Sequence, residues 1–172
     1  MLIPVYFSGG EYFIIFTRRS ELVHYHKGEI SFPGGGFHPE DRELVNTALR
    51  ESYEEIGLAP EDVEVLGELD DMLTKGSDYI VSPFVGAICP GYNFKLNRFE
   101  TAEIIQIPVK ALLEKGCRRE EPIIMVGNRP FTPYVFAYEG KMIIGATARI
   151  LKQLLDIFLE INTGGPDSKP LT

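Results

Sequence analysis

Cysteine, histidine and tryptophan are scarce in this chain of 172 residues, which contains two, three and none of them, respectively. Cys89 and Cys117 form no Cys-x-x-Cys pair and have no histidines at ligand spacing, so neither a disulfide framework nor a zinc site is supported and we expect reduced thiols. Positive charge is also in short supply, because 17 Lys and Arg face 25 Asp and Glu, for a net charge of −8. This balance argues against a nucleic-acid partner, since duplex binding needs cations that neutralise phosphates.

Long apolar runs are missing too. No stretch approaches the roughly 20 apolar residues that a bilayer-spanning helix needs. The first residues lack the basic region, apolar run and cleavage site of a secretory signal, so we expect a cytoplasmic protein without membrane contact. What the chain does have is a balance of 44% hydrophobic and 24% charged residues, typical of a globular protein with a core. At this length we expect one domain.

Segments typical of strands and of helices alternate along the chain. β-Branched and aromatic residues predict strands at 2–7 and 11–17, joined as a hairpin across Ser8-Gly9-Gly10. Apolar residues at three- and four-residue steps predict a helix from 41 to 56, which Gly57 would end. Further strands are predicted at 63–69, 79–89, 102–107, 123–126 and 134–144, a short helix at 108–115 and an amphipathic helix at 145–161.

This alternation indicates an α/β or α+β sandwich. No internal repeat or interdomain linker is visible, so residues 1–162 are expected to form a single domain. The stretch from 163 to 172 is polar and interrupted by glycine and proline, which predicts a loose C-terminal tail.

Three glutamates of the predicted central helix, Glu51, Glu54 and Glu55, stand at positions i, i+3 and i+4. Their carboxylates emerge on one side of the helix and repel one another unless positive charge lies among them, which a bound cation would supply. A solvated acidic face is the ordinary interpretation of such a run. Here, however, the segment Phe32-Pro-Gly34-Gly-Gly36 leads into the same helix, and free backbone amides beside magnesium-binding carboxylates suit a pyrophosphate. The two features together predict a metal and pyrophosphate site.

The segment from Gly35 to Leu58 resembles the Nudix box. The usual box is Gly-x5-Glu-x7-Arg-Glu-U-x-Glu-Glu-x-Gly-U, where U is aliphatic. This chain reads Gly35-x5-Asp41-x8-Arg50-Glu51-x2-Glu54-Glu55-x-Gly57-Leu58. It departs from the box in Asp41, in one extra residue before Arg50 and in Ser52 at an aliphatic position. The resemblance implies a Nudix-type α/β/α sandwich with a central mixed β-sheet, and metal-dependent hydrolysis of a nucleoside diphosphate linked to another group.

Residues 15–35 are similar to a second signature, that of the coenzyme A pyrophosphatase branch of Nudix proteins. This signature is Leu-Leu-Thr-x-Arg-Ser-x3-Arg-x3-Gly-x3-Phe-Pro-Gly-Gly. The matching residues are Arg19, Ser20, Gly28, Phe32, Pro33, Gly34 and Gly35. His24 stands where the branch has Arg, so affinity for a phosphate at this position would depend on pH near neutrality. The departures at Asp41 and before Arg50 are also habits of this branch, and further matches occur at 82–86, 100–109 and 143–151.

The resemblance implies that coenzyme A is split into 4′-phosphopantetheine and adenosine 3′,5′-bisphosphate. Glu51, Glu54 and Glu55 would hold Mg²⁺ or Mn²⁺, and Arg50 would orient these glutamates. Glu100 is the leading candidate for the general base, followed by Glu103 and Glu54. The residues expected to bind substrate, through positive charge or close backbone approach, are Arg18, Arg19, His24, Gly34, Gly35 and Gly36.

Two other functions are compatible with the same residues. One is a Nudix hydrolase of another nucleoside diphosphate derivative, such as ADP-ribose or a dinucleotide. The other is a catalytically silent nucleotide-binding module, although such modules usually lose acids from the box and this chain keeps them. Family resemblance also suggests a homodimer.

Overall fold

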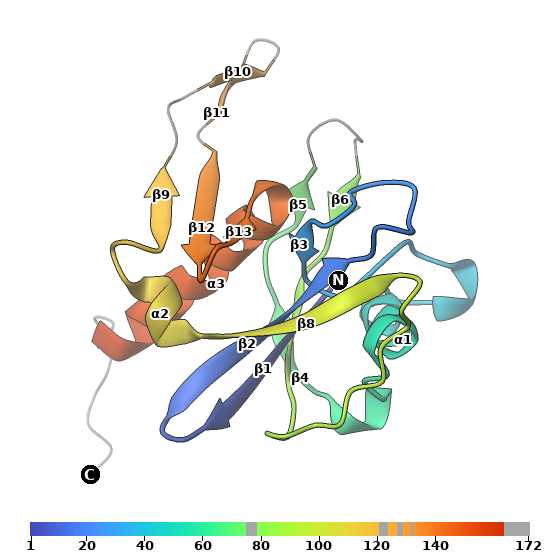
Figure 1. The fold of residues 1–172 in the computed structure, drawn as a ribbon. Coiled ribbons are helices and arrows are strands. Elements are labelled where there is room, and N and C mark those ends of the chain that lie inside the picture. The colour runs from blue at the N-terminus through green and yellow to red at the C-terminus, as the bar shows by residue number, and fades with distance from the viewer. Residues whose placement is uncertain (75–78, 121–123, 127–128, 132, 164–172) are drawn as a thin grey trace.

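The centre of the molecule is a mixed six-stranded sheet (Figure 1). The computed structural model describes residues 1–74, 79–120, 124–126, 129–131 and 133–163. The strands of the central sheet are β1 (Leu2–Ser8), β2 (Glu11–Arg19), β3 (Ile30–Ser31), β4 (Glu64–Glu68), β7 (Phe84–Ala87) and β8 (Thr101–Pro108). Their order is β3-β2-β1-β7-β4, with β8 along the other edge of β2. The β1–β7 pair is parallel and the remaining pairs are antiparallel.

Helices and smaller sheets surround this centre. The helices are α1 (Leu44–Ile56), α2 (Val109–Leu113) and α3 (Gly145–Thr163), with short 3-10 turns η1 (Pro39–Asp41) and η2 (Pro60–Asp62). The smaller sheets pair β5 (Met72–Leu73) with β6 (Ile80–Val81), β10 (Ile124–Val126) with β11 (Arg129–Phe131), and β12 (Tyr134–Tyr138) with both β9 (Arg118–Glu120) and β13 (Lys141–Ile143). Within the described ranges, no helix has the length and apolar character needed to cross a bilayer.

Alternating side chains of β2 divide the core into two layers, because successive residues of a strand point to opposite faces. Ile14 and Phe16 belong to the apolar cluster that includes Leu151 and other residues of α3. Ile15, between them, belongs to the cluster that includes Ala48 of α1. The sheet therefore lies between α1 on one face and α3 on the other (Figure 1), which confirms the predicted α/β/α sandwich with a mixed sheet.

Three predicted elements are wrong in their extent. The predicted helix from residue 41 starts at Leu44 instead, because Arg42 has a positive φ (64°), incompatible with an α-helix, that separates η1 from α1. The predicted strand 79–89 is interrupted before β7 by Pro83, which has no N–H to donate to a sheet. The predicted strand 134–144 is a hairpin, since Glu139 and Gly140 both have positive φ.

The other predicted elements are confirmed to within a few residues at their ends. Of the strand predicted at 123–126, residue 123 lies outside the described residues, and so does most of the predicted tail, at 164–172.

Candidate active site

One side of helix α1 is packed on the sheet, and its acids lie on other sides of the helix, with Glu54 exposed and Glu55 buried. Ala48 and Ile56 are fully buried on the packed side, and so is Ser52. The Ser52 hydroxyl donates to the carbonyl of Ala48 at 2.7 Å, which satisfies a polar group at a position where the Nudix box usually has an aliphatic residue. Gly57 ends the helix in the left-handed conformation (φ 69°), and its N–H donates to the carbonyl of Tyr53 at 2.8 Å.

The Asp41 carboxylate is the main partner of Arg50. It accepts from Arg50 Nε at 2.8 Å and from Nη2 at 3.0 Å, which makes the ion pair bidentate. It also accepts from the backbone N–H of His38 at 3.0 Å and from the Thr47 hydroxyl at 2.8 Å. These hydrogen bonds, that of Arg50 first, hold the pKa of Asp41 well below its usual range. Asp41 is therefore an ionised anchor for Arg50, and it lies outside the helix that carries the glutamates.

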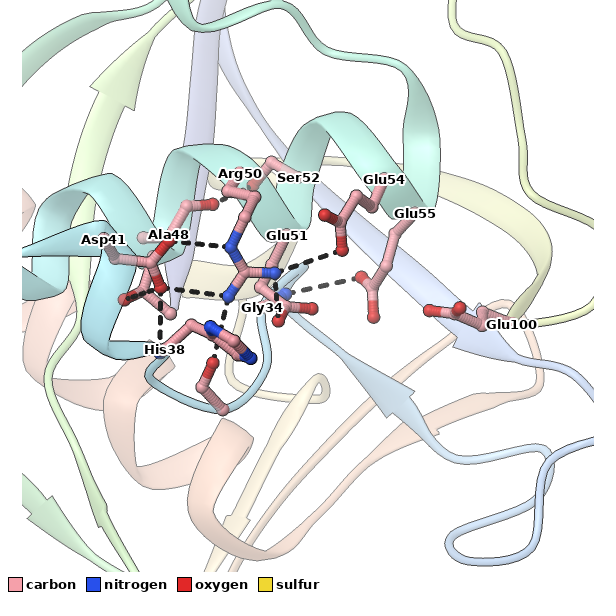
Figure 2. A network of polar contacts seen from close by, with 12 residues as sticks. Gly34, His38, Asp41, Ala48, Arg50, Glu51, Ser52, Glu54, Glu55 and Glu100 are labelled. Atoms are coloured by element: carbon pink, nitrogen blue, oxygen red, sulfur yellow. Dashed lines mark hydrogen bonds and ion pairs between the residues drawn. The ribbon is translucent and has the colours of Figure 1, made fainter.

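The Arg50 guanidinium links three segments of the site (Figure 2). Besides Asp41 of η1, it donates to Glu51 Oε1 at 2.8 Å and Glu54 Oε2 at 3.1 Å on its own helix. It also donates to the carbonyl of Gly36, in the glycine-rich loop, at 3.0 Å. Arg50 thus supplies part of the positive charge that the spacing of the glutamates demands, in addition to the cation that the sequence predicts.

Glu55 is the most deeply buried glutamate of α1, with 5% of its surface exposed, whereas the side chain of Glu54 is 50% exposed. Burial raises the pKa of Glu55 to about 8. A hydrogen bond from the N–H of Gly34 and the positive charge of Arg19 both act in the opposite direction and lower this pKa. Burial also raises the pKa of Glu51, and the charge of Glu100 adds to the shift of both. Glu51, Glu55 and Glu100 thus form one group of acids that repel one another (Figure 2).

The glycine-rich loop lies directly against these acids. Gly34 donates its N–H to Glu55 Oε2 at 3.3 Å. A Cβ on Gly35 would lie 2.6 Å from Glu51 Oε1 and closer still to other atoms of that carboxyl group, so a side chain at 35 would displace it. At Gly36 a Cβ would meet nothing within 4 Å. The position of the Glu51 carboxyl group therefore requires a glycine at residue 35, but not at residue 36.

The remaining predicted site residues divide into two sets. Arg19 and Glu100 lie within electrostatic range of Glu55, whose pKa both affect. The backbone N–H of Ser20 donates to the carbonyl of Glu100 at 2.8 Å, so the end of β2 and the start of β8 meet beside the acids. Arg18, in contrast, pairs with Glu103 through Nε and Oε2 at 2.9 Å.

His24 is exposed in the loop between β2 and β3. Among the described residues, His24 makes no hydrogen bond or ion pair with the acids, so its predicted role stays a prediction.

Three contacts of the site had no signal in the sequence. Thr47 and the backbone of His38 hold Asp41, and Asn97 donates from Nδ2 to Glu100 Oε1 at 3.2 Å. Each contact depends on how separate segments pack, and none involves residues at a spacing typical of a known motif. A hollow of about 340 Å³ beside the Asp41–Arg50 pair is lined by η1, α1 and Pro60. Glu51, Glu55 and Glu100 are not among the residues that line it.

A family model described as the NUDIX domain matches residues 1–124, which include the whole site from β1 to β8. The chain belongs to the Nudix family. A Photorhabdus laumondii protein named "Uncharacterized Nudix hydrolase NudL" is 34% identical over 141 residues, which are 82% of this chain and 74% of that protein.

Solved structures agree with this Nudix assignment at the level of the fold. A MutT/nudix family protein from Enterococcus faecalis aligns with 91% of this chain and 61% of its own, with a TM-score of 0.56 and 12% identity. An Ap4A hydrolase from C. elegans aligns with 63% of this chain and 78% of its own, with a TM-score of 0.52 and 15% identity. As a Nudix hydrolase, the protein is a pyrophosphohydrolase.

Nudix hydrolases generally use divalent metal ions, and the acids of this Nudix site fit such an ion. Carboxylate oxygens are the donors that hard divalent cations prefer, and a cation would relieve the mutual repulsion of Glu51, Glu55 and Glu100. In the part of the chain that the structure describes, no three acids, histidines or cysteines are already gathered at ligand spacing. Arg50 holds Glu51 and Glu54, so metal binding by these two side chains would compete with the guanidinium.

Proposed function

We propose that this Nudix protein hydrolyses the pyrophosphate bond of coenzyme A or a derivative, giving 4′-phosphopantetheine and adenosine 3′,5′-bisphosphate. The observation that carries the proposal is where residues 19–35 lie. Arg19, Ser20 and Gly34, which match the coenzyme A signature, approach the group of acids by charge or hydrogen bond. The position of this segment beside the acids supports the proposal that it binds a pyrophosphate.

Each residue of the site has a role in this proposal. Glu51, Glu54 and Glu55 would hold Mg²⁺ or Mn²⁺, and Arg50 orients the first two. When bound, the metal neutralises charge on the pyrophosphate and lowers the pKa of a bound water. Glu100 accepts the proton of the attacking water.

Contacts favour Glu100 over the other candidates for the base. Glu103 is engaged by Arg18 at 2.9 Å, and Glu54 accepts from Arg50 at 3.1 Å. A carboxylate held by a guanidinium is a poorer proton acceptor, because the cation favours its charged form. The Glu100 side chain accepts from the neutral amide of Asn97 instead.

Substrate binding requires positive charge beside the acids, since coenzyme A carries a 3′-phosphate in addition to its pyrophosphate. The charge of Arg19 lowers the pKa of Glu55, so Arg19 lies within electrostatic range of the acids. Arg18 and His24 are near Arg19 in sequence. We propose that these three residues bind the phosphates. Gly34, Gly35 and Gly36 let the backbone approach the substrate closely.

We also propose a cytoplasmic location and a homodimer. Cys89 is exposed and Cys117 buried, and both are free thiols, which suits a reducing compartment. Size-exclusion chromatography with light scattering tests the dimer directly, because a mass of one 19.3 kDa chain would contradict it.

A substrate panel tests the proposed function. Purified protein is incubated with Mg²⁺ or Mn²⁺ and with coenzyme A, its disulfide, an acyl derivative, dephospho-coenzyme A, ADP-ribose, NAD or Ap4A, and products are identified by mass spectrometry. We expect coenzyme A or a derivative to be cleaved fastest, and dephospho-coenzyme A more slowly. Cleavage of ADP-ribose or a dinucleotide far faster than coenzyme A would reject the choice of substrate. Metal-dependent binding in calorimetry without any hydrolysis would indicate a silent module.

A further inference from the structure

Asn97 joins two parts of the site that are distant in sequence. It lies between β7 and β8, and its backbone N–H donates to the carbonyl of Glu55, in the last turn of α1, at 3.0 Å. Its own carbonyl accepts from the N–H of Glu100 at 3.0 Å and of Thr101 at 2.8 Å. The main chain of Asn97 therefore fixes the segment that carries Glu100 to the helix that carries Glu55.

The side-chain amide of Asn97 is used at both of its ends. Oδ1 accepts from the N–H of Phe99 at 3.2 Å, which closes a local turn. Nδ2 donates to Glu100 Oε1 at 3.2 Å. Because Phe99 offers only a donor, Oδ1 must face it, and the orientation of the amide follows from this contact. The NH₂ group is thereby directed at the Glu100 carboxylate.

Glu100 needs such a partner because its neighbours repel it. The charge of Glu100 raises the pKa of Glu51 and of Glu55, so the three carboxylates repel one another when they are ionised. A Lys or Arg would hold Glu100 but would also engage it in an ion pair. The neutral amide holds Oε1 without an ion pair, and within the described part of the chain no other side chain hydrogen-bonds to the Glu100 carboxylate, so Oε2 has no side-chain partner there.

We infer that Asn97 is a positioning residue for the hydrolysis, which holds the Glu100 carboxylate toward the acids of α1 through its Nδ2 donor. This inference rests on the proposed role of Glu100 as the base. Asn97 itself touches neither substrate nor metal in this account. Its contribution is to keep Glu100 in the orientation that accepts a proton.

The substitution Asn97→Asp separates this role from a structural one. It keeps an oxygen for the N–H of Phe99 but replaces the donor that faces Glu100 by a carboxylate oxygen. Asn97→Ala removes both contacts. Asn93→Asp is the matched control, because Asn93 is exposed in the same loop and receives the same added charge.

We expect N97D to lower kcat by about 10- to 100-fold, the usual effect of losing a residue that orients a catalytic ligand. KM and the unfolding temperature should stay near those of N93D. In an E100Q background N97D should cause no further loss of kcat. Metal-free protein gives a second measurement, since the Asn97 side-chain amide signal in ¹H–¹⁵N NMR should shift in E100Q.

Two results would overturn the inference: N97D with the kcat of N93D, or an equal loss of kcat from N97D with and without E100Q. An E100Q variant with wild-type kcat would instead contradict Glu100 as the base. The failure of the inference is thus distinguishable from the failure of the proposed function.

Discussion

Arg50 and Asp41 form a bidentate ion pair, Nε to Oδ1 at 2.8 Å and Nη2 to Oδ2 at 3.0 Å, across the boundary between η1 and α1. The pair makes Asp41 an anchor for the guanidinium that in turn holds Glu51 and Glu54. Glu51 and Glu54 therefore depend for their orientation on Asp41, although Asp41 does not contact them directly.

Asp41→Asn should lower activity without unfolding the protein. The neutral amide loses the charge-assisted pair, so Arg50 is released and Glu51 and Glu54 lose their orientation; we expect kcat to fall about 10- to 100-fold. Steady-state kinetics and thermal unfolding measure this, with Glu40→Gln, an exposed neighbour, as the control. A D41N variant as active as E40Q would show that the ion pair is unimportant for catalysis.

Glu54→Gln and Glu55→Gln should each abolish turnover while leaving the fold intact. Each removes a charged oxygen donor for the metal and keeps the shape of the side chain. Turnover and Mn²⁺ binding by calorimetry should both be lost or strongly weakened, whereas Glu43→Gln, exposed at the start of the helix, should behave as wild type. Wild-type turnover in either variant would refute the assignment of metal ligands.

The stability of the metal-free protein should fall as the pH rises from about 5 to 8. Burial raises the pKa of Glu55 to about 8 in the folded protein, whereas an unfolded glutamate titrates near 4.5. Between these values the folded state binds more protons than the unfolded state, so stability is highest below the lower value and is lost as the pH approaches the higher one.

Glu55→Gln should flatten this pH profile. Because Gln carries no charge to bury, the variant should exceed wild type in free energy of unfolding by roughly 4 kcal/mol at pH 8 and by roughly 1 kcal/mol at pH 5. Urea unfolding in the presence of a chelator measures the difference. Parallel pH profiles for wild type and E55Q would contradict the raised pKa.

Gly35→Ala should lower activity more than stability. The added Cβ meets the carboxyl end of the Glu51 side chain, which can swing away but then leaves its place beside Arg50. We expect kcat to fall about tenfold or more, as for other losses of ligand orientation, with a small change in unfolding temperature. Gly36→Ala is the matched control, because nothing lies within 4 Å of a Cβ there. Equal kcat in the two variants would contradict this account of Gly35.

The sequence by itself determined strand β2, the end of the acid helix and the spacing of its glutamates. The two-residue period of β2 and the placement of Gly57 are local properties, since strand alternation and left-handed helix ends follow from the backbone of a few neighbouring residues. The spacing of Glu51, Glu54 and Glu55 likewise places them on one side of any helix. These features could be predicted because each is complete within one segment.

Only the tertiary structure decided how the acids differ. Glu54 and Glu55 are adjacent in sequence, yet one is half exposed and the other buried against Gly34, because the glycine-rich loop covers only one of them. The anchoring of Arg50 by Asp41 depends on the turn at Arg42, where φ is positive, and the anchoring of Glu100 by Asn97 depends on a loop docked to the end of α1. Burial and charge pairing between segments arise from packing, which the spacing of residues along one segment does not report.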